Sequence, residues 1–181
     1  NGGRISTDEA VQLFDWDILT LGQLAEHRRS LKYPGDEIGF IVDRIINYTN
    51  ICEAACSFCA FHARANKIKS YELSIDEILT KVDELVAIGG SQVILQGGLH
   101  PDNSLEKFVY LVKTIKTKYP DLFLHSFSPS EIVHISKKQS QNISEIVRTL
   151  KDAGLDSIPG ASDLLITRIR NKVSPNKASV E

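Results

Sequence analysis

The sequence predicts an α/β fold in which parallel strands alternate with helices, as in part of a (β/α) barrel. Short apolar runs with the composition of buried strands occur at 38–47, 92–95, 122–125 and 155–158. The segments between and after them carry apolar residues at the three- and four-residue spacing of core-facing helices. A closed barrel needs eight such units over about 250 residues. We therefore expect this chain to be the N-terminal part of a larger barrel, with its C-terminal part missing.

Two predicted helices precede the first strand and form a separate N-terminal segment, residues 1–37. Ser6 and Glu9 have the spacing of a capping box, which predicts a helix from Thr7 to about Phe14. A second helix is predicted from about Asp17 to Ser30, and the turn residues of Lys32-Tyr-Pro-Gly35 end it. Residues 38–181 then form the predicted barrel portion.

Serine and asparagine caps mark helix starts in the barrel portion. Ser74 and Glu77 repeat the capping-box pattern, and Gly89-Gly90 ends that helix. Ser128-Pro-Ser-Glu131 opens another helix with proline at its first position, and capping accounts for its serine and glutamate. The remaining helices are predicted at 105–115, 142–153 and 163–171.

Composition and charge exclude several classes of function. A net charge of −2 argues against nucleic-acid binding, which needs a basic patch. No apolar run reaches the roughly 18 residues of a membrane span, and no signal peptide is visible. Clustered cysteines without distant partners indicate a reducing compartment, so we expect a cytoplasmic protein with no membrane partner.

All three cysteines lie close together, in the pattern Cys52-x3-Cys56-x2-Cys59. A disulfide within this stretch always leaves one sulfur over. Thiolates at this spacing suit a metal ion or an iron–sulfur cluster. Three interpretations remain open: inert reduced thiols, a zinc site closed by His62, and a [4Fe–4S] cluster with three cysteine ligands. In the last case one iron keeps an open position where another molecule can bind.

Other candidate residues follow predicted strands at their C-terminal ends, where sites form in βα proteins. The glycines of Gln96-Gly97-Gly98 allow a close backbone approach to a ligand, or make an ordinary tight turn. His100 and His125 also fall at strand ends. They are candidates for polar contact with substrate or cofactor and for acid–base chemistry, with a buried structural role as the alternative.

The cysteine spacing, with Phe58 just before the last cysteine, resembles the signature of the radical S-adenosylmethionine enzymes. Five segments are similar to the radical enzymes of the futalosine route to menaquinone and to the related FO synthases. They are Asn47-Tyr-Thr-Asn-Ile-Cys52, Cys59-Ala-Phe61, Leu95-Gln-Gly-Gly-Leu-His-Pro101, Leu124-His-Ser-Phe-Ser-Pro-Ser-Glu131 and Gly154-Leu-Asp-Ser-Ile-Pro-Gly160. The His-Ser-Phe-Ser-Pro stretch is closer to dehypoxanthine futalosine cyclase than to aminofutalosine synthase. Pro159-Gly-Ala-Ser-Asp163 departs from the family pattern, Pro-Gly-Gly-Gly-Ala-Glu, because it has no acidic residue at the usual place.

The resemblance implies a partial (β/α) barrel of radical S-adenosylmethionine type. Cys52, Cys56 and Cys59 would hold a [4Fe–4S] cluster. Gln96, Gly97 and Gly98 would contact the methionine end of S-adenosylmethionine, Phe58 would cover its adenine, and His100 and His125 would contact the substrate.

The implied reaction is the cyclisation of dehypoxanthine futalosine after a 5′-deoxyadenosyl radical abstracts a ribose hydrogen. FO synthase and aminofutalosine synthase chemistry are the alternatives. The resemblance also implies a flavodoxin- or ferredoxin-like electron donor. A zinc-stabilised binding module is the alternative of another class.

Overall fold

The structure of the protein is a computed structural model that describes residues 3–54, 56–63, 68–160 and 166–179. The chain divides into two compact units. We call them the helical unit (Asn1–Phe40) and the sheet unit (Ile41–Glu181). The sequence placed this boundary after residue 37.

The helical unit contains α1 (Thr7–Gln12), the 3-10 turn η1 (Leu13–Asp15) and α2 (Ile18–Lys32). The predicted capping box is present, since Ser6 and Glu9 exchange hydrogen bonds between side chain and backbone in both directions. Neither helix contains a buried residue, and the side chain of Phe14 is exposed. Both helices therefore form from local signals without a core of their own.

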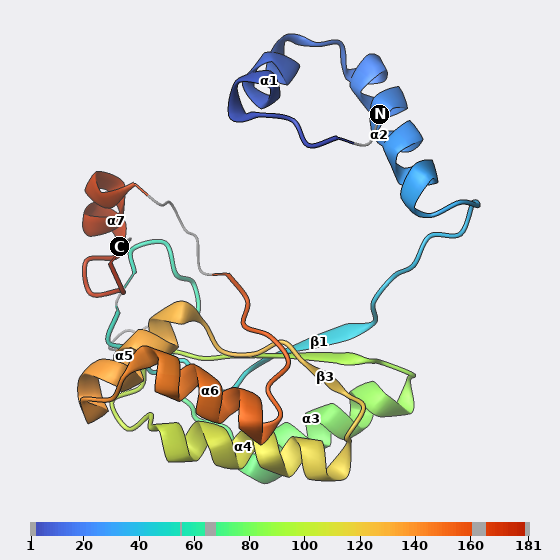
Figure 1. The fold of residues 1–181 in the computed structure, drawn as a ribbon. Helices are drawn as coiled ribbons and strands as arrows, with labels where there is room; N and C mark the ends of the chain where they lie inside the picture. Colours follow the sequence, from blue (N-terminus) through green and yellow to red (C-terminus); the bar gives the residue numbers. More distant parts are fainter. Residues whose placement is uncertain (1–2, 55, 64–67, 161–165, 180–181) are drawn as a thin grey trace. The chain divides into compact units, whose positions relative to one another are not determined.

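The sheet unit is built on three parallel strands in the order β1-β2-β3 (Figure 1). They are β1 (Asp43–Asn47), β2 (Gln92–Gln96) and β3 (Phe123–Leu124). Asp43 pairs with Gln92, and Gln92 pairs with Phe123, so the strands begin at a common level. The predicted α/β class with parallel strands is confirmed.

Two predicted strands are shorter than expected. The strand predicted at 38–47 begins only at Asp43, because its partner β2 begins at Gln92, after the turn at 88–91 that follows the preceding helix. The strand predicted at 155–158 is reduced to a single parallel bridge between His125 and Ser157. Apolar β-branched composition is therefore not sufficient for a strand where no neighbouring backbone runs alongside.

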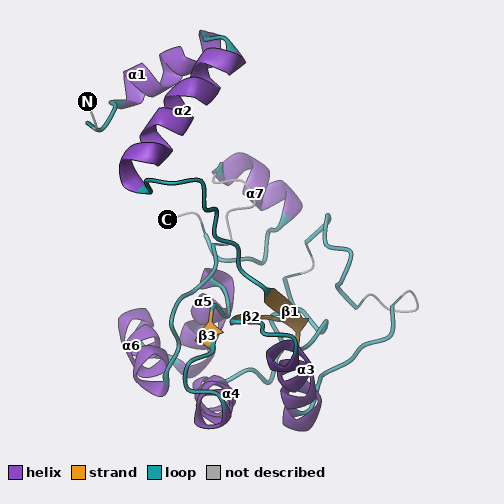
Figure 2. Ribbon diagram, turned by 90° about the vertical axis from the view of Figure 1, so that its right-hand side faces the viewer, coloured by secondary structure: helices purple, strands orange, loops and turns teal. Residues whose placement is uncertain are grey.

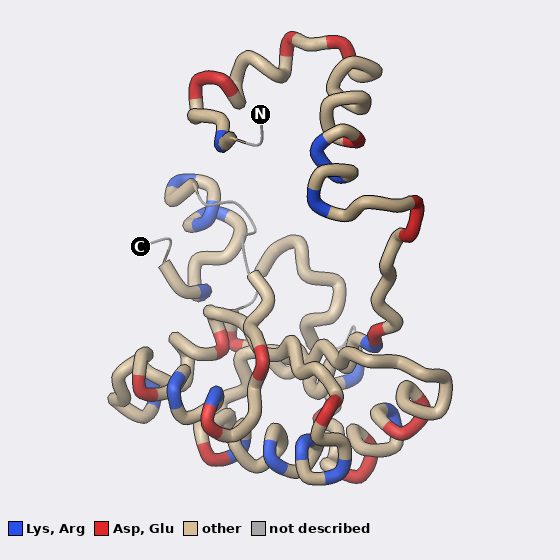
Figure 3. The backbone as a smooth tube through the Cα atoms, turned by 45° about the vertical axis from the view of Figure 1, so that its right-hand side comes forward, with Lys and Arg blue, Asp and Glu red and all other residues tan. Residues whose placement is uncertain are grey.

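Helices α3 (Ile75–Ala87), α4 (Leu105–Lys118) and α6 (Ile143–Ala153) cover one face of the sheet (Figures 1 and 2). The remaining helices are α5 (Pro129–Gln139) and α7 (Thr167–Val173). Positions 163–165 of the last predicted helix lie outside the described residues. Acidic and basic residues are interspersed along the outer helices (Figure 3). Among the described residues, no helix is both long and apolar enough for a membrane span.

The core lies between these helices and the sheet face that they cover. Leu95 and Leu124 on the strands are completely buried, and so are Val82 on α3 and Val112 on α4. Each such aliphatic side chain contributes roughly 1.5–3 kcal/mol through its removal from water. On the opposite face Ile45 is exposed. This packing fixes the C-terminal ends of β1, β2 and β3 next to one another.

Candidate cofactor site

One cavity of about 290 Å³ lies at the C-terminal ends of β1 and β2. It brings together the three cysteines and every residue that the sequence predicted to contact the cofactor. The chain segments that line it are the cysteine loop, the end of β2, the first turn of α5 and the C-terminal segment. Their lining residues include Cys52, Cys56, Phe58, Cys59, His62, Gln96, Gly97, Gly98, Ser128, Ser130, Glu131 and Lys177.

The cysteine loop is fixed at its start by two polar side chains that follow β1. The Thr49 hydroxyl donates to the carbonyl of Tyr71 at 2.9 Å. Asn50 accepts from the Tyr71 amide at 2.8 Å and donates to the carbonyl of Lys69 at 3.0 Å. The buried amide and hydroxyl thus add side-chain hydrogen bonds to a segment whose backbone pairs with this loop through a single antiparallel bridge, between Thr49 and Glu72.

Gly97 and Gly98 are required by close packing of the two loops. A Cβ at Gly97 would lie 2.3 Å from the ring of Tyr48, and a Cβ at Gly98 would lie 2.1 Å from the carbonyl oxygen of Ile51. Glycine therefore lets the loop after β2 lie directly against the cysteine loop. Both glycines also line the cavity, so their backbone groups are near any bound ligand.

The sulfur atoms have surroundings that suit an iron–sulfur cluster. The Leu99 amide donates to Sγ of Cys52 at 3.2 Å, a type of hydrogen bond that tunes cluster potentials. Cys56 is buried with Ala54 and Leu99 in a small apolar cluster. In the part of the chain that the structure describes, no three Cys, His, Asp or Glu side chains converge on one metal ion. A four-iron cube does not need such convergence, because each thiolate binds a different iron.

Glu131 is a site residue that the sequence did not identify. Its carboxylate oxygen Oε1 accepts from the Tyr48 hydroxyl at 2.5 Å and from the Gly97 amide at 3.3 Å. Burial raises the pKa of Glu131 to about 7, although Ser128, Tyr48, the Gly97 amide and the charge of Lys177 act in the opposite direction. Burial also raises the pKa of Tyr48 well above its ordinary value.

The sequence explained Glu131 by helix capping, and that explanation is incomplete. Ser128 does accept from the Glu131 amide, at 3.2 Å. The Glu131 carboxyl group, however, reaches Tyr48 and Gly97. The available signal was the position of Tyr48 directly after β1, but nothing in the spacing links it to Glu131.

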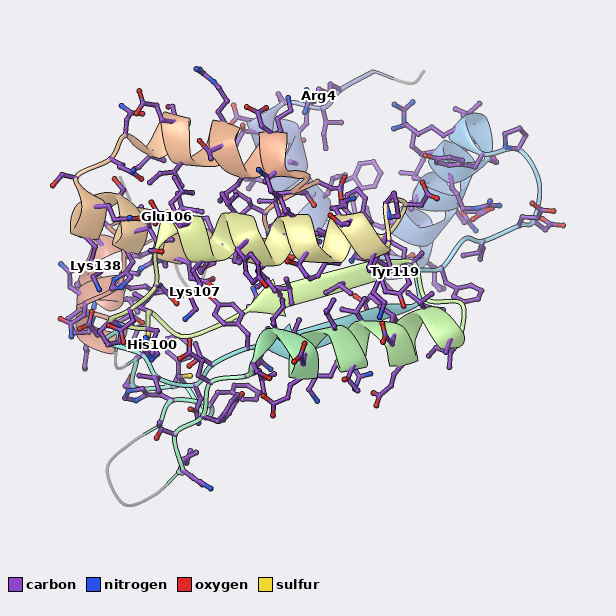
Figure 4. All side chains as sticks on the ribbon, turned by 90° about the horizontal axis from the view of Figure 1, so that it is seen from below. Arg4, His100, Glu106, Lys107, Tyr119 and Lys138 are labelled. Atoms are coloured by element: carbon purple, nitrogen blue, oxygen red, sulfur yellow. The ribbon has the colours of Figure 1, made fainter. Side chains whose placement is uncertain are left out.

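Neither of the two candidate histidines is among the described residues that line the cavity. His100 is buried, and its Nδ1 accepts from the Asp102 amide at 2.9 Å. It lies at the same end of α4 as Lys107 (Figure 4). Nδ1 of His125 is 2.6 Å from the hydroxyl oxygen of Ser157. Contact of either histidine with a substrate stays a prediction.

Comparison with known proteins finds relatives that match nearly the whole length of this chain. Cyclic dehypoxanthine futalosine synthase of Halalkalibacterium halodurans is 36% identical over 183 residues, which cover 100% of this chain and 50% of that protein. The 5-amino-6-(D-ribitylamino)uracil–L-tyrosine 4-hydroxyphenyl transferase of Cyanothece sp. is 38% identical over 185 residues, which cover 97% of this chain and 49% of that protein. The chain thus spans about half the length of the curated relatives it matches.

A solved structure supports the fold. The crystal structure of HydG, a maturase of the [FeFe]-hydrogenase, superposes with a TM-score of 0.65 at 16% identity, covering 89% of this chain and 34% of that one. The sequence profile of the Radical SAM superfamily matches residues 46–163, which include all three cysteines and the glycine turn. This chain therefore belongs to the Radical SAM superfamily, whose members use a [4Fe–4S] cluster and S-adenosylmethionine.

Proposed function

We propose that the protein is a radical S-adenosylmethionine cyclase that converts dehypoxanthine futalosine to its cyclic form in menaquinone biosynthesis. The observation that carries this proposal is the 36% identity to a cyclic dehypoxanthine futalosine synthase over 100% of the chain. The three thiols and the glycine turn around one cavity supply the donor groups that such an enzyme needs. A cytoplasmic location and a flavodoxin- or ferredoxin-like electron donor belong to the same proposal.

The residues of the cavity have separate tasks in this proposal. Cys52, Cys56 and Cys59 hold the cluster, and Gln96, Gly97 and Gly98 contact the methionine end of S-adenosylmethionine. Phe58 lines the cavity with an exposed ring that is available to stack on adenine. When bound, the cluster and S-adenosylmethionine supply a 5′-deoxyadenosyl radical, which abstracts hydrogen from carbon.

The substrate is expected on the sheet face that α3, α4 and α6 do not cover. Successive residues of a strand point to opposite faces, so Gln96 lies on the face opposite to the buried Leu95. His125 follows the buried Leu124 and lies on that same open face. His125 is therefore the better placed of the two predicted substrate contacts, since His100 follows the glycine turn and is buried beside α4.

A second candidate function rests on the relative from Cyanothece, whose name specifies transfer of a 4-hydroxyphenyl group from L-tyrosine to 5-amino-6-(D-ribitylamino)uracil. This relative is 38% identical to the chain, slightly more than the 36% of the cyclase from Halalkalibacterium halodurans. The cluster and S-adenosylmethionine serve both reactions, so the residues of this cavity do not separate them.

The two candidates differ in substrate and are separated by turnover. The full-length protein is loaded with its cluster under anaerobic conditions, reduced, and given S-adenosylmethionine. One sample receives dehypoxanthine futalosine, and another receives 5-amino-6-(D-ribitylamino)uracil with L-tyrosine. We expect 5′-deoxyadenosine and the cyclic product only with dehypoxanthine futalosine. Turnover of the uracil and tyrosine pair alone would establish the second candidate instead.

Metal content tests the cluster against the zinc alternative. We expect about four irons and negligible zinc in the parent protein, and loss of the iron and its absorbance in Cys52→Ala, Cys56→Ala and Cys59→Ala. His62→Ala is the matched control, because His62 closes the site only in the zinc interpretation. A His62→Ala variant that releases the metal, or cysteine variants that keep it, would contradict this assignment.

A further inference from the structure

Glu131 lines the cofactor cavity, and its carboxyl group is buried in a way that disfavours the charged form. Only 2% of the residue is exposed. Desolvation disfavours its charged form, and for this reason its pKa is raised to about 7. A glutamine would accept from the Tyr48 hydroxyl and the Gly97 amide equally well without carrying a charge. The presence of a carboxylic acid here points to a charge that serves a ligand, since strongly perturbed groups cluster at functional sites.

The charges around the cavity point to the kind of ligand group. Among the described residues that line it, the Asp, Glu, Lys or Arg side chains are the carboxyl group of Glu131 and the amine of Lys177, and their ionised forms carry these charges. They have opposite signs, and the charge of Lys177 lowers the pKa of Glu131, so the two are close enough to interact. One acidic and one basic group in the same cavity are complementary to an α-amino acid, which carries an amino group and a carboxylate.

A hydrogen bond places the carboxyl group of Glu131 next to the glycine turn, Gly97-Gly98. Its Oε1 accepts from the Gly97 amide at 3.3 Å. Gly97 and Gly98 are the residues proposed to contact the methionine end of S-adenosylmethionine. The carboxyl group and the glycine turn therefore face the same part of the ligand.

We propose that Glu131 accepts hydrogen bonds from the amino group of the methionine moiety of S-adenosylmethionine. Tyr48 is a positioning residue in this proposal, because its hydroxyl donates to Oε1 and fixes the carboxyl group. The inference depends on S-adenosylmethionine as the cofactor and is independent of the final substrate.

The test compares three probes on Glu131→Gln and on the parent, both cluster-loaded, full-length and not reduced. S-adenosylmethionine and S-adenosylhomocysteine both carry the amino group, but the second lacks the positive charge on sulfur. 5′-Methylthioadenosine lacks the amino acid altogether. We expect Glu131→Gln to bind the first two more weakly by on the order of tenfold, the range for a charge-assisted hydrogen bond. Binding of 5′-methylthioadenosine should stay within about twofold.

Glu77→Gln is the matched control, since Glu77 occupies the same place in an exposed helix cap. It should bind all three probes as the parent does. Equal weakening of 5′-methylthioadenosine, or unchanged binding of S-adenosylmethionine, would overturn the proposal. Weakening of S-adenosylmethionine alone would show that Glu131 faces the sulfonium group and would overturn it as well.

A pH series on the parent tests the proposal even if Glu131→Gln folds poorly. The charged or titratable groups that act on the pKa of Glu131 are Tyr48, directly after β1, and Lys177 near the C-terminus. Ionisation of Glu131 as the pH rises through about 7 should strengthen binding of S-adenosylhomocysteine. Glu131→Asp should keep this rise and Glu131→Gln should lack it. A parent affinity that is flat or falls from pH 6 to pH 8 would refute the assignment.

These outcomes are distinct from failure of the proposed function. A parent that binds S-adenosylmethionine as described but turns over neither candidate substrate would refute the cyclase and leave the role of Glu131 intact. If the parent turns over dehypoxanthine futalosine and Glu131→Gln binds all three probes normally, the cyclase function stands and the role of Glu131 is refuted.

Discussion

Three helices of this chain begin with the same four-residue pattern, a serine followed three residues later by a glutamate, but the glutamates have different surroundings. At α1 and α3 the serine accepts from the glutamate amide at 3.2 and 3.3 Å, and the glutamate carboxylate accepts from the serine amide. At α5 the serine accepts in the same way, at 3.2 Å. Its glutamate, Glu131, instead reaches the cofactor cavity.

The difference shows that a local pattern determines where a helix starts and does not determine what its side chains contact. The hydrogen bonds of Ser6 and Ser74 lower the pKa of Glu9 and of Glu77, both of which are exposed. Burial raises the pKa of Glu131. The same spacing thus produces two stabilising surface caps and one buried group whose ionisation is unfavourable.

The largest expected effect tests whether α5 and α1 differ in packing as well as in their caps. Ile135 on α5 is completely buried, whereas Val11 on α1 is 60% exposed. Ile135→Ala should lower the free energy of unfolding by about 2–5 kcal/mol, and Val11→Ala should change it by less than about 0.5 kcal/mol. Urea unfolding followed by circular dichroism measures both. Similar losses of unfolding free energy in the two variants would show that α5 and α1 do not differ in packing.

The second prediction concerns the sign of the pH dependence. Glu131 binds its proton more tightly in the folded protein, so its contribution is present at low pH and is lost as the pH rises from about 4.5 to about 7. At about 1.4 kcal/mol per pKa unit this loss is at most about 3.5 kcal/mol.

Glu131→Gln should therefore match the parent in stability near pH 5 and exceed it at pH 8. Glu77→Gln should behave in the opposite way. The pKa of Glu77 is lowered, so its contribution is present above the ordinary pKa and is lost on acidification. Unfolding curves for both variants at the two pH values provide the measurement, and the same sign in both would contradict the assignment.

A smaller effect is expected from the caps themselves. Ser74→Ala should lower the free energy of unfolding by about 1 kcal/mol, because it leaves the Glu77 amide without its acceptor. Ser6→Ala should fray α1, which buries nothing, and leave the unfolding of the sheet unit unchanged. Amide hydrogen exchange at Glu9 and Glu77 distinguishes local fraying from global loss, and a global loss in Ser6→Ala would break the comparison.

The smallest effect is a change in the pKa of Glu131 itself. The Tyr48 hydroxyl donates to the carboxylate and so opposes the rise caused by burial. Tyr48→Phe should raise the pKa of Glu131 further, which carboxyl carbon chemical shifts in an NMR titration would show. A lowered pKa would mean that water replaces the hydroxyl as donor.

Much of the fold was predictable because its signals are local. The cap at Ser74, the apolar spacing through Leu85 and the glycines that follow define α3 almost to the residue. Strands were less predictable, since residues 38–42 have strand composition but no partner strand. The cysteines and the glycine turn were visible as motifs. Glu131 was not, because the contact that defines its role is with Tyr48, 83 positions away.

The hydrogen bond from residue 99 to the sulfur of Cys52 comes from the main chain. Any amino acid except proline at position 99 therefore supplies the same donor. A substitution at position 99 other than by proline therefore leaves the hydrogen bond to this sulfur in place. The leucine side chain itself packs against Ala54 and Cys56. In the proposed cluster site, redox tuning would thus depend on the amide of Leu99 and core packing on its side chain.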